Sequence, residues 1–382
     1  MAIGAAPGLT VRPYSTAYPD LVKGGGELVT RVELLIDGAP VSSTEDGSLG
    51  LRLDAGTITA DRGPTTANAR QANLRFVETD DAPSTLVDDL SSISGNELRV
   101  SFGLGDADLF TQGVFGVSSR RRRPTGEGWA WQITGLDRSR RVSKAGFTTP
   151  YVAIAGDDLV DVLVGIYTSR IPFDVEVIVE GSTGATVEAD TAYTVGADPA
   201  AAGRKLAAAA GSYVRFDADG RLRIGPITDD FDEIVWSYAG DAVTLEDLEQ
   251  SDDDEELYNG VVVIGDGSFL LFPVRGEAWI DDPSDPLNRA RIGERPKIIR
   301  NATVATDAQA TAVAQAELNL LPGGSEVIVW DVAPNPAHEL GDVFDAQLTS
   351  AGIDDRWVLD AYTLNMDTGA MRGTTRKRRS AS

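Results

Sequence analysis

The chain has 382 residues, of which 42% are hydrophobic and 24% charged, and its formal net charge is -25. This length exceeds the roughly 250–300 residues at which a single hydrophobic core stops growing, so two or more domains are expected. The acidic excess argues against general binding of nucleic acid or of an anionic membrane. The chain contains no cysteine and only one histidine, His338, which excludes disulfides, cysteine-ligated zinc and thiol catalysis and disfavours histidine-based triads.

Residues 1–26 are predicted to form an irregular N-terminal arm that ends in the glycine linker Gly24-Gly25-Gly26. The start of the chain lacks a basic segment followed by an apolar run, so it is not expected to be a secretory signal. No stretch of the sequence approaches the ~20 apolar residues of a membrane span. The sequence is therefore interpreted as that of a soluble protein with no membrane span.

A β unit is predicted over residues 27–148. Short runs alternate apolar and polar residues, for example Val32, Leu34 and Ile36, or Trp129, Trp131 and Ile133. This period of two is typical of antiparallel strands that bury one face in a barrel or sandwich.

Residues 149–230 are predicted to form a small α/β domain. Apolar residues at helical spacing follow Asp157 and Asp158, and a second helix is marked by Asp198 as N-cap with Pro199 in the first helical position. The segment Ser212–Ile224 then predicts a hairpin, because two alternating runs flank an Asp-Gly turn.

The remaining residues, 231–382, are predicted to form a second β-barrel domain with one helix and a basic C-terminal tail. Thr306 and Gln309 fit a capping box for that helix, and Ala310, Val313 and Leu321 share its apolar stripe.

No group of residues fits a catalytic, cofactor or metal site, so the sequence predicts neither an enzyme nor a cofactor. The acidic runs at Glu246–Glu256 and Asp281–Asp285 lack the ligand spacing of a calcium loop and are interpreted as solvated loops. His338 is interpreted as part of a surface loop before a strand. The basic run Arg120, Arg121, Arg122 and Arg123 lies between two predicted strands and is more consistent with a hairpin tip that docks on an acidic neighbouring subunit than with phosphate binding.

This order of domains resembles that of the tail-hub proteins of long-tailed bacteriophages, also described as minor tail, tail-tip or baseplate-hub proteins. Three stretches carry the resemblance: the helix and hairpin of Asp198–Pro226, the Leu340-Gly341-Asp342-Val343-Phe344 start of a strand, and the terminal hairpin ending in Gly369-Ala370-Met371-Arg372. Frequent Ala, Gly, Asp and Arg also suggest a phage of a GC-rich actinobacterial host.

The resemblance implies a mainly β protein with a small α/β domain and two tube-type β-barrel domains in the tail-hub arrangement. Three chains would then present six similar domains, so that a homotrimer adapts the sixfold tail tube or distal tail protein to threefold tip components. The implied partners are the distal tail or tail tube protein, the tape measure protein, and tail-tip fibre or spike proteins. The implied location is the tail tip of the virion, after assembly in the host cytoplasm.

The acidic composition fits a channel through which DNA passes without specific binding, because negative charge repels phosphates. The acidic residues predicted to face this channel are Asp54, Asp61, Asp252, Asp253, Asp254, Glu255 and Glu256. Basic residues such as Arg120–Arg123 would then lie at subunit contacts.

Two other interpretations remain open at this point. The six tryptophans could include sugar platforms of a carbohydrate-binding or glycan-cleaving virion protein, although Trp129, Trp131 and Trp357 lie in strand patterns typical of cores or interfaces. The chain could also be the spike-base hub of a contractile injection system, since such proteins share the hub fold.

Overall fold

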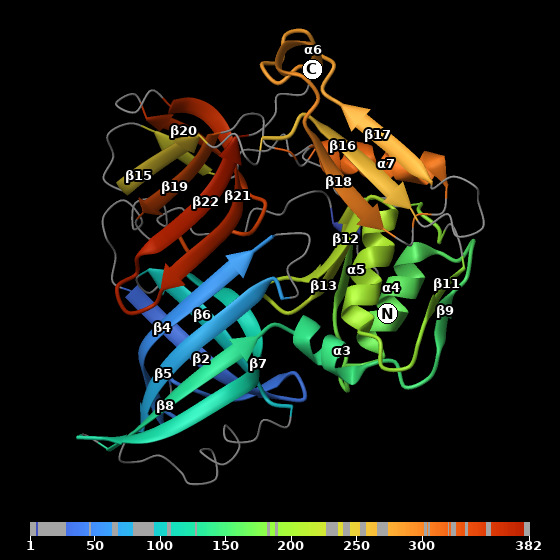
Figure 1. The fold of residues 1–382 in the computed structure, drawn as a ribbon. Helices are drawn as coiled ribbons and strands as arrows, with labels where there is room; N and C mark the ends of the chain where they lie inside the picture. The colour runs from blue at the N-terminus through green and yellow to red at the C-terminus, as the bar shows by residue number, and fades with distance from the viewer. Residues whose placement is uncertain are drawn as a thin grey trace.

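The computed structural model describes most of the chain (Figure 1). The described residues are 5–6, 28–45, 47–62, 68–78, 95–104, 108–126, 128–181, 184–187, 190–226, 236–239, 245–252, 257–265, 274–301, 304, 306–319, 321, 326–332, 335–348 and 353–377. Of the predicted N-terminal arm, only Ala5–Ala6 falls within them, as strand β1. The rest of the arm, with its glycine linker, lies outside the described residues.

The first β unit consists of seven antiparallel strands whose apolar residues alternate with polar ones. Its strands are β2 (Leu28–Ile36), β3 (Ala39–Ser43), β4 (Leu51–Asp61), β5 (Arg70–Glu78), β6 (Glu97–Leu104), β7 (Asp108–Thr125) and β8 (Gly128–Leu136). They pair in the order β4-β5-β8-β7-β6-β2-β3. Along β5, Ala72, Leu74 and Phe76 are buried while Arg75 between them is exposed, as a strand with one covered face requires.

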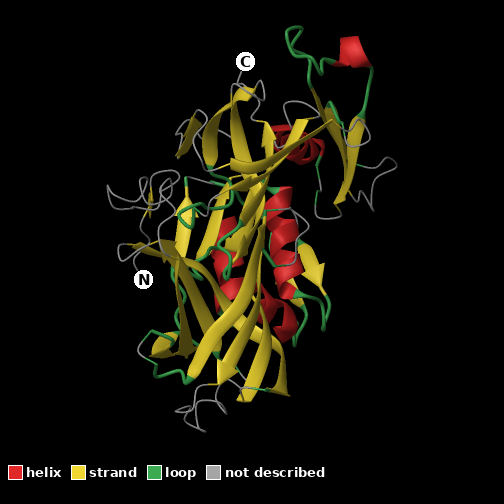
Figure 2. Cartoon of the chain, turned by 90° about the vertical axis from the view of Figure 1, so that its left-hand side faces the viewer, coloured by secondary structure: helices red, strands yellow, loops and turns green. Residues whose placement is uncertain are grey.

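The C-terminal strands extend the same sheet. They are β14 (Trp236–Ala239), β15 (Leu245–Asp252), β19 (Glu326–Val332), β20 (Val343–Leu348), β21 (Ile353–Asn365) and β22 (Met371–Lys377). Strand β21 pairs antiparallel with β4, so that Tyr362 lies opposite Ala60. Among the described strands, the two β units therefore form one 13-stranded sheet that runs along much of the molecule (Figure 2).

One hydrophobic core serves both β units. It contains Phe76 and Trp131 from the first unit together with Trp357 and Leu364 from the C-terminal strands. Because these side chains are shielded from water by both units, burial of apolar area stabilises the two units together.

The α/β domain has its own core and lies beside the first β unit, coloured green in Figure 1. Its elements are α3 (Ser139–Ala145), β9 (Tyr151–Ala153), α4 (Leu159–Thr168), β10 (Val177–Glu180), β11 (Thr191–Tyr193), α5 (Pro199–Ala209), β12 (Ser212–Phe216) and β13 (Leu222–Pro226). β12 and β13 form the predicted hairpin, and β10 pairs in parallel with β13 and with β1.

Helices α4 and α5 begin where the sequence indicates, whereas helix α3 was not predicted. The Asp158 carboxylate accepts hydrogen bonds from the N–H groups of Val160 and Asp161, and Asp198 does the same for Ala200 and Ala201. Each carboxylate thereby satisfies two N–H groups that the helix itself leaves unpaired.

A further α/β unit is formed by residues 257–321, with a separate core of its own. It comprises β16 (Gly260–Gly265), β17 (Arg275–Trp279), α6 (Arg289–Ile292), β18 (Pro296–Asn301) and α7 (Asp307–Asn319). Helix α7 covers the sheet face that carries Val261 and Val263, and the Thr306 hydroxyl accepts a hydrogen bond from the N–H of Gln309, as in the predicted capping box.

The predicted fold class, mainly β with a small α/β domain, is confirmed. The domain boundaries 27–148, 149–230 and 231–382 stay predictions. Within the range 231–382, the described residues pack into two places: the shared β core and the core of residues 257–321.

Candidate functional site: the polar junction and the surfaces beside it

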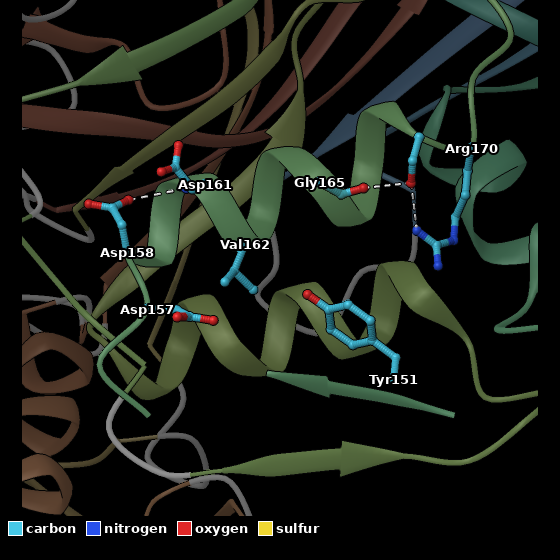
Figure 3. A pocket seen from close by; sticks show the side chains of 8 residues that line it. Tyr151, Asp157, Asp158, Asp161, Val162, Gly165 and Arg170 are labelled. Carbon is cyan, nitrogen blue, oxygen red and sulfur yellow. Dashed lines mark hydrogen bonds between the residues drawn. The ribbon is translucent and has the colours of Figure 1, made fainter. Parts of the chain in front are cut away.

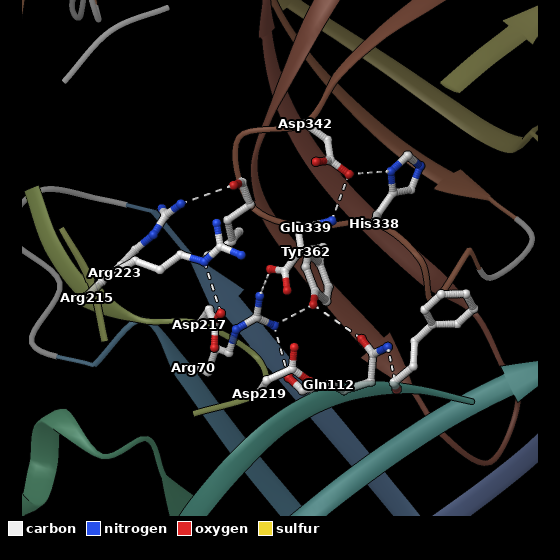
Figure 4. A network of polar contacts seen from close by, with 12 residues as sticks. Arg70, Gln112, Arg215, Asp217, Asp219, Arg223, His338, Glu339, Asp342 and Tyr362 are labelled. Atoms are coloured by element: carbon white, nitrogen blue, oxygen red, sulfur yellow. Dashed lines mark hydrogen bonds and ion pairs between the residues drawn. The ribbon is translucent and has the colours of Figure 1, made fainter. Parts of the chain in front are cut away.

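A buried arginine connects the two β units. Arg70, the first residue of β5, is 2% exposed. Its Nη1 donates to the backbone carbonyl of Gln112 at 3.0 Å and to the Tyr362 hydroxyl at 2.7 Å, while Nη2 forms an ion pair with Glu339. These partners come from β7, β21 and the loop before β20, as Figure 4 shows.

Electrostatics keep this arginine charged despite its burial. Desolvation alone would lower its pKa, but the Glu339 carboxylate and the Tyr362 hydroxyl outweigh that cost and hold the pKa of Arg70 above its ordinary value. A buried charge of this kind is tolerated only while its partners stay in place. The relative position of the two β units is therefore fixed by polar groups as well as by the shared core.

A second buried pair connects the first β unit to the hairpin of the α/β domain. Arg138 and Glu97 are 8% and 2% exposed at their side chains, and Arg138 Nη2 lies 2.7 Å from Glu97 Oε2. Arg138 Nη1 also donates to the carbonyl of Gly220 at 2.6 Å. Gly220 has φ of +76°, and a Cβ there would lie 3.0 Å from the Arg138 guanidinium, so glycine allows this close approach.

The hairpin turn itself is held by a cluster of charges. The Asp217 carboxylate accepts from Arg221 at 2.8 Å and from Arg223 at 3.0 Å, and Arg223 reaches Glu180 at 2.5 Å. Arg215 Nη2 donates to the Leu340 carbonyl at 3.4 Å, which ties the hairpin to the C-terminal β unit. The hairpin thus contacts both β units.

The prediction that His338 occupies a surface loop is wrong. The residue precedes β20 as expected, but its side chain is 1% exposed, and its Nδ1 lies 3.2 Å from Asp342 Oδ2. Its ring packs against Trp330 and Phe344, with centroids 6.4 and 6.1 Å away. The loop carrying Glu339 passes through the interior because its polar groups find partners there.

The junction is suited to holding domains in place. The ion pairs Arg138–Glu97 and Arg70–Glu339 join residues that lie 41 and 269 positions apart in the chain. Within the described part of the chain, no three His, Asp or Glu side chains are arranged to hold a metal ion. No described helix is both long and apolar enough to cross a membrane.

The four arginines lie within strand β7 rather than between two strands. Residues Arg120 to Arg123 pair with Ile133 to Ala130 of β8, close to the end of the hairpin. Arg122 binds both carboxylate oxygens of Glu78, at 2.8 and 2.9 Å, and its guanidinium lies 4.4 Å from the centre of the Trp129 ring. Their predicted role at a subunit interface stays a prediction.

The predicted acidic channel residues are spread over the molecule. Asp54 sits at a bulge in β4 and forms an ion pair with Arg75 at 3.2 Å. Asp61 is the exposed last residue of β4. Asp252 is the last residue of β15, so the predicted loop is wrong from Glu246 to Asp252, where the acidic run forms a strand. The other four, Asp253, Asp254, Glu255 and Glu256, lie outside the described residues. Their predicted exposure to a channel stays a prediction.

An acidic groove lies along helix α4 (Figure 3). Its volume is about 530 Å³, and it is lined by Tyr151, Asp157, Asp158, Asp161, Val162, Gly165, Ser169 and Arg170. Burial raises the pKa of the Tyr151 hydroxyl, although the nearby Arg170 opposes that shift. The sequence analysis identified Asp157 and Asp158 only as residues of the helix start.

Sequence reasoning missed the junction, although one signal was present. Arg70 has the same phase in β5 as Ala72, Leu74 and Phe76, so an arginine stands on the covered face of an otherwise apolar strand. Such a position predicts a buried, paired charge.

Comparisons with solved structures identify the fold. A 43 kDa tail protein of prophage MuSo2 from Shewanella oneidensis matches with a TM-score of 0.62 at 14% identity, covering 91% of this chain and 98% of that chain. The tail protein from Neisseria meningitidis MC58 matches with a TM-score of 0.61 at 13% identity, covering 91% and 96%.

A component of the type VI secretion system of E. coli, described as similar in structure to the T4 bacteriophage tail proteins gp27 and gp5, gives a TM-score of 0.52 at 9% identity and covers 86% and 75%. No protein-family model and no curated protein sequence matches this chain. The chain therefore has the fold of phage tail proteins.

Proposed function

We propose that the chain is a structural protein of a bacteriophage tail, located at the tail tip as the hub of the baseplate. The observation that carries this proposal is the likeness to two prophage tail proteins over 91% of this chain and nearly the whole of theirs. A fold shared over the full length, with both β units and the α/β domain, supports a shared architectural role more strongly than a single shared domain would.

The proposed hub is a homotrimer that adapts sixfold to threefold symmetry. Each chain contributes two β units whose relative position is fixed by the β4–β21 pairing and by Arg70. Three chains therefore supply six β units at fixed spacing, which suits contact with a sixfold tail tube or distal tail protein on one side. The threefold symmetry that remains suits fibre or spike proteins on the other. A ring of this kind closes through head-to-tail contacts between copies.

In this proposal the ring surrounds the path that the tape measure protein and then the DNA follow out of the virion. The net charge of -25 supports a lumen that repels phosphates, since a duplex carries one negative charge per ~1.7 Å of its axis. Asp54, Asp61, Asp252 and the acidic run that follows Asp252 are the proposed lumen residues.

A second candidate is the spike base of a contractile injection system. The likeness to the E. coli type VI secretion component favours it, although that match has a lower TM-score and covers less of both chains. The carbohydrate hypothesis is weaker, because Trp131, Trp330 and Trp357 are 6%, 3% and 1% exposed and so cannot serve as sugar platforms.

Electron microscopy of the purified chain tests the hub directly. Concentrated protein is expected to give particles whose class averages have threefold symmetry and an axial opening. Asp54 and Asp61 are not residues of the polar junction, so lysine substitutions at these two positions should leave the particles intact. Averages with twofold symmetry would contradict the hub.

A further inference from the structure

The hairpin of β7 and β8 extends beyond the sheet that supports it. Strand β5 pairs with β8 only as far as Ala130, whereas β7 and β8 continue to pair up to Thr125 and Gly128. Residues 120–130 are called the arm below; the arm projects from the first β unit at the lower left of Figure 1. A two-stranded ribbon without further support gains stability from a partner surface.

The arm displays a preorganised aromatic and basic surface. Trp129 is 42% exposed, and the Arg122 guanidinium is stacked on it while Glu78 holds that guanidinium by two hydrogen bonds. Trp131 donates to the same carboxylate at 2.6 Å. The side chains of Trp129, Arg122 and Trp131 are therefore already ordered and lose little conformational entropy on binding. Tryptophan and arginine are the residues that most often dominate interface energies.

Two further arginines of the arm face solvent. Arg121 and Arg123 are exposed, and neither forms an ion pair with any carboxylate that the structure describes. In a chain with 59 acidic residues, two neighbouring cations left for an external partner indicate that the partner is acidic.

The groove along α4 offers the complementary surface. The Asp157 and Asp161 side chains are exposed and form no ion pair among the described residues. The groove is open to solvent, and its volume of about 530 Å³ is sufficient for an indole ring.

The arm and the groove lie on opposite sides of the molecule, with the arm at the lower left and α4, β9 and β11 at the right of Figure 1. A chain cannot place its arm in its own groove without unfolding, but a second copy can. Two different complementary patches on opposite sides are what a head-to-tail ring requires.

We propose that the arm of one chain binds the α4 groove of the next copy. Trp129 lies on one face of the two-stranded arm and enters the groove against Tyr151 and Val162. Arg121 and Arg123 project from the other face of the arm and pair with Asp157 and Asp161 across the groove. This inference rests on the proposed function, because it specifies which surfaces join the copies of the hub.

The absence of cysteine permits a sharp test by cross-linking. Gly126→Cys places a thiol at the tip of the arm, and Gly165→Cys places one in the groove; a Cβ at either position meets no other atom within 4 Å. The two variants of the full chain are mixed and treated with a short bismaleimide. A covalent dimer is expected from the mixture and not from either variant alone.

A matched control replaces Ala290, an exposed residue of α6, with cysteine. Mixed with Gly126→Cys, this variant should yield no more dimer than random collision gives. Adding Trp129→Ala to the arm variant should weaken association at least about tenfold, as for an interface residue of central importance. Asp161→Lys in the groove should likewise reduce the yield, and Arg123→Glu in the arm should restore it.

The outcomes separate this inference from the hub itself. If the yield of cross-linked dimer from Gly126→Cys with Gly165→Cys does not exceed the yield with the Ala290→Cys control, the inference is overturned. A mass of three chains by light scattering on the same samples would then leave the proposed hub intact. A chain that carries both Gly126→Cys and Gly165→Cys tests how many copies the contact joins. If the specific dimer forms and this double variant gives cross-linked products of more than three copies, the arm–groove contact holds while the trimeric hub is contradicted.

Discussion

Replacing Arg70 by methionine should destabilise the shared β core far more than the same change at an exposed arginine of the same strand. Arg70→Met removes two hydrogen bonds from a charged donor, to Gln112 and Tyr362, each contributing about 1.5–3 kcal/mol. It also removes the ion pair with the Glu339 carboxylate, and breaking a buried pair costs about 3–5 kcal/mol.

These contributions overlap and do not add. Glu339 is 23% exposed, so water relieves part of the stranded charge. We therefore expect a loss of about 3 kcal/mol in the free energy of unfolding. The matched control is Arg75→Met, because Arg75 is on the same strand but is 46% exposed in its pair with Asp54. An exposed pair of this kind contributes about 1 kcal/mol or less.

Urea unfolding followed by tryptophan fluorescence measures the difference, because Trp330 and Trp357 lie in the shared core at 3% and 1% exposure. Glu339→Gln should cost less in the Arg70→Met background than in the unaltered chain, as expected for directly coupled residues. The reasoning is refuted if Arg70→Met and Arg75→Met shift the unfolding midpoint equally.

Three further predictions concern the α/β domain. Gly203→Ala should destabilise the domain by about 1–3 kcal/mol, because the added Cβ would lie 2.5 Å from the buried Tyr167 ring. Gly165→Ala, whose Cβ would meet no atom within 4 Å, should instead stabilise helix α4 by up to ~1 kcal/mol. Thermal unfolding of both variants would show whether their changes in stability have opposite signs. Asp198→Ala should cost about 1 kcal/mol by removing the N-cap of α5, while Asp198→Asn should retain most of that stability; equal losses in chemical denaturation would argue against capping. Burial, reinforced by Tyr151, raises the pKa of the Tyr193 hydroxyl to about 12. The contribution of the protonated Tyr193 to stability is therefore intact below pH 10 and is lost as the pH rises toward 12. The difference in phenolate absorbance between the native chain and Tyr193→Phe should appear near pH 12, and a difference already complete at pH 10 would contradict the burial argument.

Helix caps and tight hairpins could be predicted from the sequence, because the residues that form them lie close together in the chain. The N-caps Asp158 and Asp198, the Thr306 capping box and the hairpin after α5 all depend on residues a few positions apart. The strand pattern was equally readable, because a covered face imposes a period of two.

Long-range features could not be predicted in the same way. The pairing of β21 with β4 joins Tyr362 to Ala60, and hydrophobic periodicity does not specify which strand becomes the neighbour. The separate core of residues 257–321 combines β16 with β18 in parallel across a connection that contains β17 and α6. Burial of His338 depends on Asp342 and on rings from two other strands, so its loop context alone suggested the surface.

In the candidate site, too, local sequence features could be predicted and long-range contacts could not. The arginines of β7 form a distinctive basic run in the sequence. The stacking of Arg122 on Trp129 and its ion pair with Glu78 depend on the pairing of three strands, which the run does not specify. The groove was not identified, since its wall combines the start of β9 with one face of α4.

The native mass of the purified chain, measured by light scattering over a range of concentrations, tests the central claim most directly. The account predicts a shift from one chain to three on concentrating, with no stable species of two chains. A closed dimer that persists at every concentration would contradict the trimeric hub.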